Sequence, residues 1–315
     1  MTTVRAFTFP GQGSQTVGMG KALADAYGEA RAVFEQVDEA LGEPLSRLMF
    51  DGPEEELVLT RNAQPALMAV SLAVVRVLEA ESGKPISDLA GYVAGHSLGE
   101  YSALAAARAL DIADAAKLLR LRGDAMQSAV PVGEGAMAAL LGVSLETARE
   151  IAAEGHAAGV CDIANDNADG QVVISGAKAA VERAVAAAAG KGARKSIMLP
   201  VSAPFHCGLM APAADAMASA LAITDLRKPV IPLVANVLAD KLEDPSEIRI
   251  RLVEQVTGMV RWRESVLWMA AHGVTDIVEL GAGKVLTGMA KRIDRSLKGS
   301  AIGTPEEIAA FLESL

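Results

Sequence analysis

Short apolar runs alternate with longer helical stretches along much of the 315-residue chain. The runs have the length of strands and lie at 4–9, 89–94, 231–234 and 276–280. The longer stretches have helical periodicity and lie at 20–41, 63–81, 98–110, 112–129, 211–221, 248–255, 265–271, 284–293 and 305–312. Strands that alternate with helices are typical of a parallel sheet with helices on both faces. The two ends of the chain therefore predict one α/β domain.

The pattern changes between residues 131 and 200, where six shorter elements follow one another in the order βαββαβ. They are expected at 136–141, 145–154, 160–164, 171–175, 178–189 and 194–199, with a polar turn at 165–170. This order is that of a ferredoxin-like module. We predict a ferredoxin-like small domain at 131–200, inserted into a large domain made of 1–130 and 201–315. With little chemistry of its own, the small domain is interpreted as one wall of a cleft.

One junction between a predicted strand and helix carries candidate chemistry. Ser97 lies within Gly95-His96-Ser97-Leu98-Gly99, a Gly-x-Ser-x-Gly motif. Between a strand and a helix, this motif forms the nucleophile elbow of the α/β-hydrolase fold, whose glycines let strand and helix pack closely. We therefore predict an α/β-hydrolase-like large domain with Ser97 as nucleophile. The alternative interpretation is a Gly-flanked turn with a solvated serine.

A serine nucleophile requires a base within hydrogen-bond reach, and the chain contains four histidines. His96 is the neighbour of Ser97, so its side chain should point to the opposite face and pack. We interpret His156 as a solvated cap and His272 as a partner of a helix dipole. His206 lies where the chain returns to the large domain, at the mouth of any cleft, and is predicted as the base. The alternative is a buried histidine beside a proline turn.

Composition and charge exclude several classes of protein. No apolar run approaches the ~20 residues of a membrane span, and the N-terminus lacks the apolar region of a secretory signal. We therefore expect a cytoplasmic protein that does not contact a membrane. The net charge of −10 argues against a nucleic-acid partner. Cys161 and Cys207 are too few for a disulfide framework, and no pattern suggests a metal site.

Six motifs together resemble the family of malonyl-CoA:acyl carrier protein transacylases over nearly the whole chain. They are FPGQGSQ at 9–15, GHSLGE at 95–100, RG at 122–123, VSAPFH at 201–206, VEQ at 253–255 with VRW at 260–262, and GAGKVL at 281–286. The last motif departs from the family pattern, since many members have Pro where Ala282 stands. The resemblance implies a ping-pong transfer of malonyl from malonyl-CoA to the phosphopantetheine thiol of acyl carrier protein. This reaction supplies fatty acid elongation and needs no permanently bound cofactor.

The resemblance also implies the roles of individual residues. Ser97 would attack the malonyl thioester with His206 as general base. A main-chain carbonyl at Gln255 would orient the histidine, where hydrolases use a carboxylate. The backbone N–H groups of Gln12 and Leu98 would form the oxyanion hole, and the elbow itself favours Leu98 in this role.

Two further residues would select the acyl group. By resemblance, the guanidinium of Arg122 would hold the malonyl carboxylate through two parallel hydrogen bonds. Without the family, Arg122 looks like one of several basic residues on a solvated helix face. Phe205 would favour malonyl over methylmalonyl, because a large ring leaves no room for a branch. Asn165 and Asn167 resemble residues that border the family's cleft, although roles in a polar turn fit equally well.

The remaining expectations concern partners and alternatives. Acyl carrier proteins are acidic, as is this chain, so a local basic patch must offset the overall repulsion. We also expect a monomer. Candidates for this patch are Lys191, Arg194, Lys195, Lys284, Lys291 and Arg292. A malonyl transacylase of polyketide synthesis is an open alternative. A serine esterase or thioesterase fits less well, because it would place its histidine late in the chain after an acid. A non-enzymatic scaffold would not need Ser97, His206 and Arg122 together.

Overall fold

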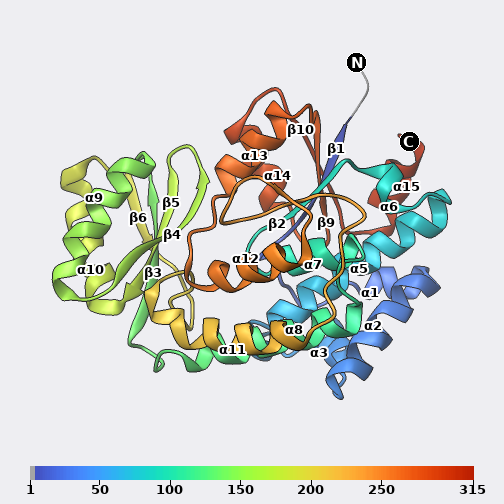
Figure 1. Cartoon of the computed structure of the whole chain (residues 1–315), viewed down its shortest axis with the longest axis horizontal. Coiled ribbons are helices and arrows are strands. Elements are labelled where there is room, and N and C mark those ends of the chain that lie inside the picture. Colours follow the sequence, from blue (N-terminus) through green and yellow to red (C-terminus); the bar gives the residue numbers. More distant parts are fainter. Residues whose placement is uncertain (1–3) are drawn as a thin grey trace.

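The strands form two separate sheets in the computed structural model, which describes residues 4–315 (Figure 1). The larger sheet has six strands in the order β10-β9-β1-β2-β7-β8. All neighbours in it are parallel except β8, which pairs antiparallel with β7. The bounds are Arg5–Phe9 (β1), Tyr92–Gly95 (β2), Leu233–Val234 (β7), Lys241–Leu242 (β8), Asp276–Leu280 (β9) and Lys298–Ile302 (β10).

Helices cover both faces of this sheet. They are α1 (Lys21–Ala26), α2 (Gly28–Leu41), α3 (Leu45–Asp51), α4 (Glu54–Leu57), α5 (Thr60–Ser82), α6 (Ile86–Leu89), α7 (Gly99–Ala106), α8 (Ile112–Ser128), α11 (Ala211–Ile223), α12 (Pro245–Thr257), α13 (Trp262–Ala271), α14 (Val285–Ile293) and α15 (Pro305–Glu313). Successive side chains of a strand point to opposite faces. Phe7 and Phe9 accordingly pack with α5 and α7, whereas Ala6 packs with α13 and α14. The predicted parallel α/β sheet is confirmed.

Some local predictions for the large part are wrong. The stretch 20–41 is two helices rather than one, because Tyr27 adopts an extended conformation with φ −129° and ψ 129°. Strand β10 was not predicted, since its sequence, Lys-Gly-Ser-Ala-Ile, is half polar. It lies at the edge of the sheet, where one side of a strand needs no apolar cover.

Helix α5 has the length and composition of a membrane span, with a mean hydropathy of 1.4 over its most apolar window. However, 83% of that window is buried within the protein. It packs against α2 and α8 in the core cluster that also contains Phe7 and Phe9. The apolar character of α5 is therefore that of a core helix.

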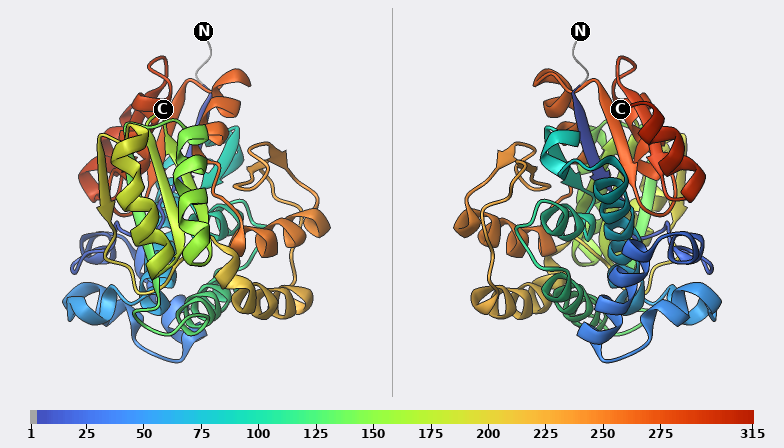
Figure 2. Two further views of the ribbon diagram at one scale, coloured as in Figure 1. Left: turned by 90° about the vertical axis from the view of Figure 1, so that its left-hand side faces the viewer. Right: turned by 90° about the vertical axis from the view of Figure 1, so that its right-hand side faces the viewer.

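The second sheet has four antiparallel strands in the order β4-β5-β3-β6. Two helices cover one of its faces, on the side away from the large sheet (Figure 2). The elements are β3 (Gly135–Leu141), α9 (Leu145–Gly155), β4 (Cys161–Ala168), β5 (Gln171–Ala177), α10 (Lys178–Ala188) and β6 (Lys195–Met198). This is the predicted ferredoxin-like arrangement. The boundaries 131 and 200, as limits of a domain, stay a prediction.

The predicted polar turn at 165–170 is wrong. Strand β4 continues through Ala168, and Asn165, Asp166 and Asn167 are buried within it. This segment pairs with residues far along the chain. Val260 forms a parallel bridge with Asn165, and its backbone oxygen accepts a hydrogen bond from the N–H of Asp166 at 3.0 Å. Strand β4 thus joins the small sheet to the large part of the molecule.

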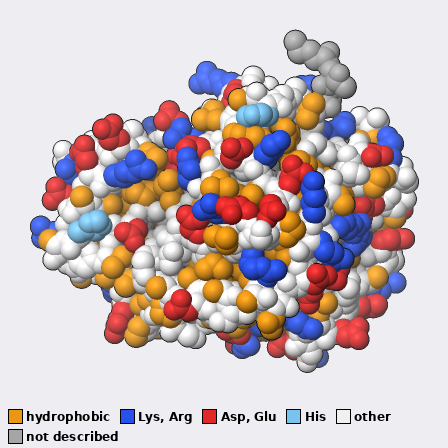
Figure 3. Space-filling view, viewed as in Figure 1, with side chains coloured by type: hydrophobic (Ala, Val, Ile, Leu, Met, Phe, Trp, Pro, Cys, Tyr) orange, Lys and Arg blue, Asp and Glu red, His pale blue; other side chains and the backbone are white. Residues whose placement is uncertain are grey.

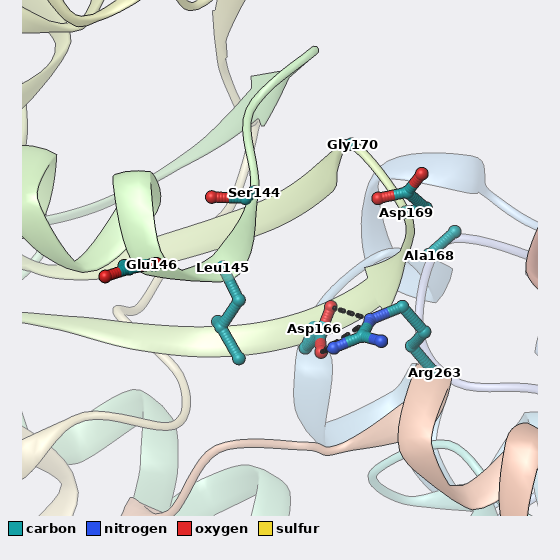
Figure 4. Close-up of a pocket in the computed structure, with 8 residues that line it drawn as sticks. All are labelled: Ser144, Leu145, Glu146, Asp166, Ala168, Asp169, Gly170 and Arg263. Carbon is teal, nitrogen blue, oxygen red and sulfur yellow. Dashed lines mark hydrogen bonds and ion pairs between the residues drawn. The ribbon is translucent and has the colours of Figure 1, made fainter.

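An ion pair reinforces this junction. The guanidinium of Arg263 binds the carboxylate of Asp166 through Nε, at 3.1 and 2.9 Å, and through a terminal nitrogen at 2.8 Å. The pair lines a pocket of about 290 Å³ between the β4–β5 hairpin and the start of α9 (Figure 4). None of the predicted catalytic residues lines this pocket.

Candidate active site

Ser97 lies in a tight turn between β2 and α7, at the carboxyl end of the central strands. Its φ is 53°, in the left-handed region that non-glycine residues rarely adopt. A Cβ on Gly95 would lie 1.8 Å from the carbonyl oxygen of Gly99, and one on Gly99 would lie 2.2 Å from that of Phe9. Only glycine fits at these two positions. This geometry is that of a nucleophile elbow.

The side chain of Asn236, which follows β7, holds the elbow in place. Its Oδ1 accepts the backbone N–H of Ser97 at 2.8 Å, and its Nδ2 donates to the carbonyl of Gly95 at 2.7 Å. Asn236 was not predicted, because no local motif marks it and its partners belong to β2 and the turn that follows.

Ser97 precedes the small sheet in the sequence and His206 follows it, and the fold brings the two side chains together. The Nε2 atom of His206 lies 2.7 Å from the Ser97 hydroxyl, and Nδ1 lies 2.9 Å from the carbonyl oxygen of Gln255. That oxygen is in the last turn of α12, where helix carbonyls lack an intrahelical partner. The carbonyl therefore fixes the ring so that Nδ1 carries the proton and Nε2 faces the serine.

Burial and charge favour the neutral form of this histidine. Burial, and then the positive charge of Arg122, lower the pKa of His206 to about 3. At neutral pH the imidazole is therefore a free base that can accept the serine proton. The backbone of His206 has a φ of 58°, as unusual as that of Ser97.

Arg122 lies on α8 and is buried beside Ser97 and His206, and not on a solvated face. Its terminal nitrogens donate to Oε1 of Gln64 at 2.8 Å, to Oε1 of Gln255 at 2.8 Å and to the Ser97 hydroxyl at 3.1 Å. Within residues 4–315, its Nε has no partner, and no carboxylate lies within ion-pair distance. The guanidinium can thus accept an anionic ligand next to the serine.

A chain of side chains connects Arg122 with the loop after β1. The amide of Gln64 donates from Nε2 to the hydroxyl of Thr60 at 2.9 Å. That hydroxyl in turn donates to Oε1 of Gln12 at 2.9 Å. Gln64 and Thr60 were not predicted, since their role appears only once α5 is packed against α8.

The two predicted oxyanion-hole donors come from two loops, Gln12 from the loop after β1 and Leu98 from the turn before α7. Leu98 directly precedes α7, where backbone N–H groups have no intrahelical acceptor. Within the described part of the chain, the backbone N–H groups of Leu98 and Gln12 have no protein acceptor. The N–H of Ser97, by contrast, is occupied by Asn236.

The remaining predicted residues lie around this centre. Phe205 is half-buried and packs against the cores of both the large part and the small sheet. His96 points away from Ser97, with Nε2 at 2.8 Å from Oδ1 of Asn167, and burial lowers its pKa. His156 and His272 are exposed, and each contacts a backbone carbonyl, of Cys161 and Trp268 respectively. Among residues 4–315, no cluster of His, Cys, Asp or Glu has the makings of a metal site.

Comparison with known proteins gives the family. The model of the acyl transferase domain matches residues 6–304. The chain belongs to the acyl transferase family. Within this family, a relative from Escherichia coli K12 named malonyl CoA-acyl carrier protein transacylase is 48% identical over 98% of both chains. The resemblance predicted from the six motifs is therefore confirmed.

Solved structures of acyl transferase relatives agree in fold. The acyl-carrier-protein-S-malonyltransferase of Bartonella henselae is 54% identical, with a TM-score of 0.97 over 99% of both chains. A malonyl-transacylase solved with its type II polyketide acyl-carrier protein is 41% identical, with a TM-score of 0.95 over 99% of this chain and 100% of that one.

Proposed function

We propose that this acyltransferase moves a malonyl group from malonyl-CoA to the phosphopantetheine thiol of acyl carrier protein. The observation that carries the proposal is the buried Arg122, whose terminal nitrogen lies 3.1 Å from the hydroxyl of Ser97. A buried cation beside a nucleophile favours an acyl group with a carboxylate at its far end.

The proposed mechanism has two half-reactions through one intermediate. His206 takes the proton of Ser97 as the serine oxygen attacks the thioester carbonyl, and the protonated imidazole then returns that proton to the leaving thiolate of coenzyme A. In the second half, His206 takes the proton of the phosphopantetheine thiol, and the thiolate attacks the malonyl-serine ester. The serine leaves with the proton from His206.

The negative charge that develops on the carbonyl oxygen needs donors in both halves. We assign this role to the free backbone N–H groups of Gln12 and Leu98, which require no rearrangement during the reaction. Gln255 orients His206 without adding a charge. Phe205 limits the space for branched acyl groups beside the base.

The acidic carrier protein must dock on a chain whose net charge is also negative. Acidic and basic side chains are interspersed on the face shown in Figure 3, so a docking patch would be small. Of the six basic candidates, Lys191 is paired with Glu150 and Glu154, and Lys284 with Glu307. We retain Arg194 and Lys195 as the first positions for charge reversal, and propose a monomeric, cytoplasmic enzyme of fatty acid elongation.

Polyketide synthesis is the second candidate pathway. It is favoured by the complex of one relative with a type II polyketide acyl-carrier protein. Transfer to carrier proteins of both pathways, measured side by side, separates these two roles.

Intact-protein mass spectrometry tests the proposed function directly. After mixing with malonyl-CoA, the wild-type protein should gain the mass of one malonyl group, and acyl carrier protein should remove it. The Ser97→Ala variant should gain none. An adduct of equal yield on this variant would place the nucleophile elsewhere, and release of free malonate instead of transfer would indicate a thioesterase.

A further inference from the structure

A buried carboxylate lies behind the active site without a part in the proposed mechanism. Glu100 is in the first turn of α7, three residues after Ser97, and is 1% exposed. Its Oε1 accepts the backbone N–H of Asn236 at 3.3 Å, and its Oε2 accepts a short hydrogen bond from Nε2 of Gln255.

This contact determines how the Gln255 amide is oriented. A carboxylate only accepts hydrogen bonds, so the NH₂ group of Gln255 must face Glu100. The amide oxygen then points the other way, where it accepts from Arg122 at 2.8 Å. The same NH₂ group also donates to the carbonyl of Ser97 at 3.0 Å. Glu100 therefore acts on both Arg122 and the nucleophile turn through one side chain.

Glu100 also supplies a charge that Arg122 otherwise lacks. A fully buried guanidinium without an ion-pair partner is costly, and a carboxylate one amide away offsets part of that cost. The groups whose charges couple to Glu100 are Arg122 on α8 and Tyr101 on α7 itself. Two further groups contact it, the backbone N–H of Asn236 after β7 and the side-chain amide of Gln255 on α12, and neither titrates.

We propose that Glu100 is a positioning residue that sets how strongly the site selects an acyl carboxylate. In the free enzyme it orients Gln255 and balances the charge of Arg122, and the incoming carboxylate takes over this balance when it binds. The inference rests on the proposed malonyl transfer. It assigns Glu100 a role that the transfer mechanism itself does not require.

A proton link follows from this geometry. Two carboxylates that share one buried guanidinium repel each other, so binding of the second favours protonation of the first. Burial already raises the pKa of Glu100 to about 7, which places this protonation near neutral pH. Malonyl-CoA should therefore bind more tightly as the pH falls from about 8 to about 6, with uptake of a proton.

The test measures binding by calorimetry in a Ser97→Ala background, where acylation cannot follow. Malonyl-CoA should bind on the order of fivefold more tightly at about pH 6 than at about pH 8. In the double variant Ser97→Ala/Glu100→Gln, the affinity for malonyl-CoA should be high at both pH values. Acetyl-CoA, which has the same coenzyme A phosphates but no acyl carboxylate, should show no such dependence in either protein.

Glu279→Gln in the same background is the matched control. Glu279 is also fully buried and its pKa is also raised by burial, but it lies on β9, where it accepts hydrogen bonds from Thr287. This variant should retain the pH dependence. Glu100→Asp, which keeps the charge, should retain it too.

Two outcomes would overturn the proposal: the same pH dependence for malonyl-CoA in the Glu100→Gln variant, or the same dependence for acetyl-CoA. If Glu100→Gln does not fold, a second measurement tests the proposal. It is the proton uptake of the Ser97→Ala protein on ligand binding, measured by calorimetry in buffers of different ionisation enthalpy. Uptake with malonyl-CoA but not with acetyl-CoA supports the proposal, and no difference contradicts it. Absence of any malonyl adduct on the wild-type protein would instead contradict the proposed function.

Discussion

Ser97 and His206, the proposed nucleophile and base, both have strained backbones, with φ of 53° and 58° respectively. Such conformations cost on the order of 1 kcal/mol each for residues with a side chain. Hydrogen bonds hold them in place: Asn236 accepts from the backbone N–H of Ser97 and donates to the carbonyl of Gly95, and the carbonyl of Gln255 accepts from the His206 ring. The strain is therefore part of a preformed site whose two reacting atoms already lie 2.7 Å apart.

The lowered pKa of His206 predicts an unusual pH profile. A general base loses activity as the pH falls through its pKa, so a pKa of about 3 moves the acid limb far below the ordinary histidine value of 6.5. Acylation of Ser97 by an uncharged ester should thus persist below about pH 5. In Arg122→Met, which lacks the positive charge, the limb should move to higher pH. Stopped-flow acylation rates across the pH range measure the acid limb in the wild-type protein and in the variant. An unshifted acid limb in Arg122→Met would contradict the influence of Arg122 on the pKa of His206.

Arg122 is also the residue on which substrate choice should depend. Arg122→Ala removes the guanidinium that we propose as partner of the acyl carboxylate, but leaves Ser97 and His206 in the chain. We expect kcat/KM for malonyl-CoA to fall at least about 100-fold, with a much smaller change for acetyl-CoA. Competition between the two thioesters, resolved by mass spectrometry, measures this preference. Unchanged preference for malonyl would remove Arg122 from substrate recognition.

Among the elements, the turn from β2 to α7 is the most demanding. A Cβ on Gly99 would overlap the end of strand β1, and a Cβ on Gly95 would overlap the first turn of α7, so neither glycine has space for a side chain. The backbone N–H of Leu98 and the hydroxyl of Ser97 both belong to this one turn, as the oxyanion role that we propose for Leu98 requires. Two neighbouring elements contribute near their ends: the last turn of α12 by the carbonyl and side chain of Gln255, and the loop after β1 by Gln12.

We predict that Gly99→Ala destabilises the protein severely. Its Cβ would overlap the backbone of Phe9, which has no flexible end that can move aside. The expected loss in the free energy of unfolding is about 3 kcal/mol or more. Gly288→Ala in α14 is the control, because its Cβ meets nothing within 4 Å. There we expect a gain of about 0.5–1 kcal/mol, and urea unfolding of both variants measures the contrast.

The whole molecule places the site where two sheets of different construction meet. Ser97 comes from the large sheet, whereas His206 follows the segment that returns from the small one. Their relative position depends on how the small sheet is attached. The attachment runs through β4, by its bridge to Val260 and by the Asp166–Arg263 pair.

Breaking this attachment should affect both stability and catalysis. Arg263→Met leaves the carboxylate of Asp166, which is 1% exposed, without its partner. We expect a loss of about 2–4 kcal/mol in the free energy of unfolding and a lower kcat. The double variant with Asp166→Asn should recover part of the loss, as a double-mutant cycle by urea unfolding would reveal. As a control, removal of the exposed Lys21–Asp51 pair should cost under about 1 kcal/mol in the free energy of unfolding. An equally small cost for Arg263→Met would contradict the role of the Asp166–Arg263 pair in attaching the small sheet.

Local sequence determined the features that depend on neighbours along the chain. The alternation of strands and helices, the βαββαβ order and the glycines around Ser97 all follow from periodicity and backbone sterics within a few residues. The family motifs added His206, Arg122, Gln255, Gln12, Leu98 and Phe205 as candidates. Their spacing, however, contained no information about distances between them.

Only the tertiary structure decided how polar residues are used. Asn165, Asp166 and Asn167 look like a turn in sequence, yet they form a buried strand because Val260, Arg263 and His96 satisfy them. Glu100, Asn236, Gln64 and Thr60 gain their roles in the same way. A hydrogen bond or a buried charge depends on a partner that can lie over 100 residues away, as Glu100 and Gln255 do. Burial and pairing are properties of the folded chain, whereas periodicity is already present in the sequence.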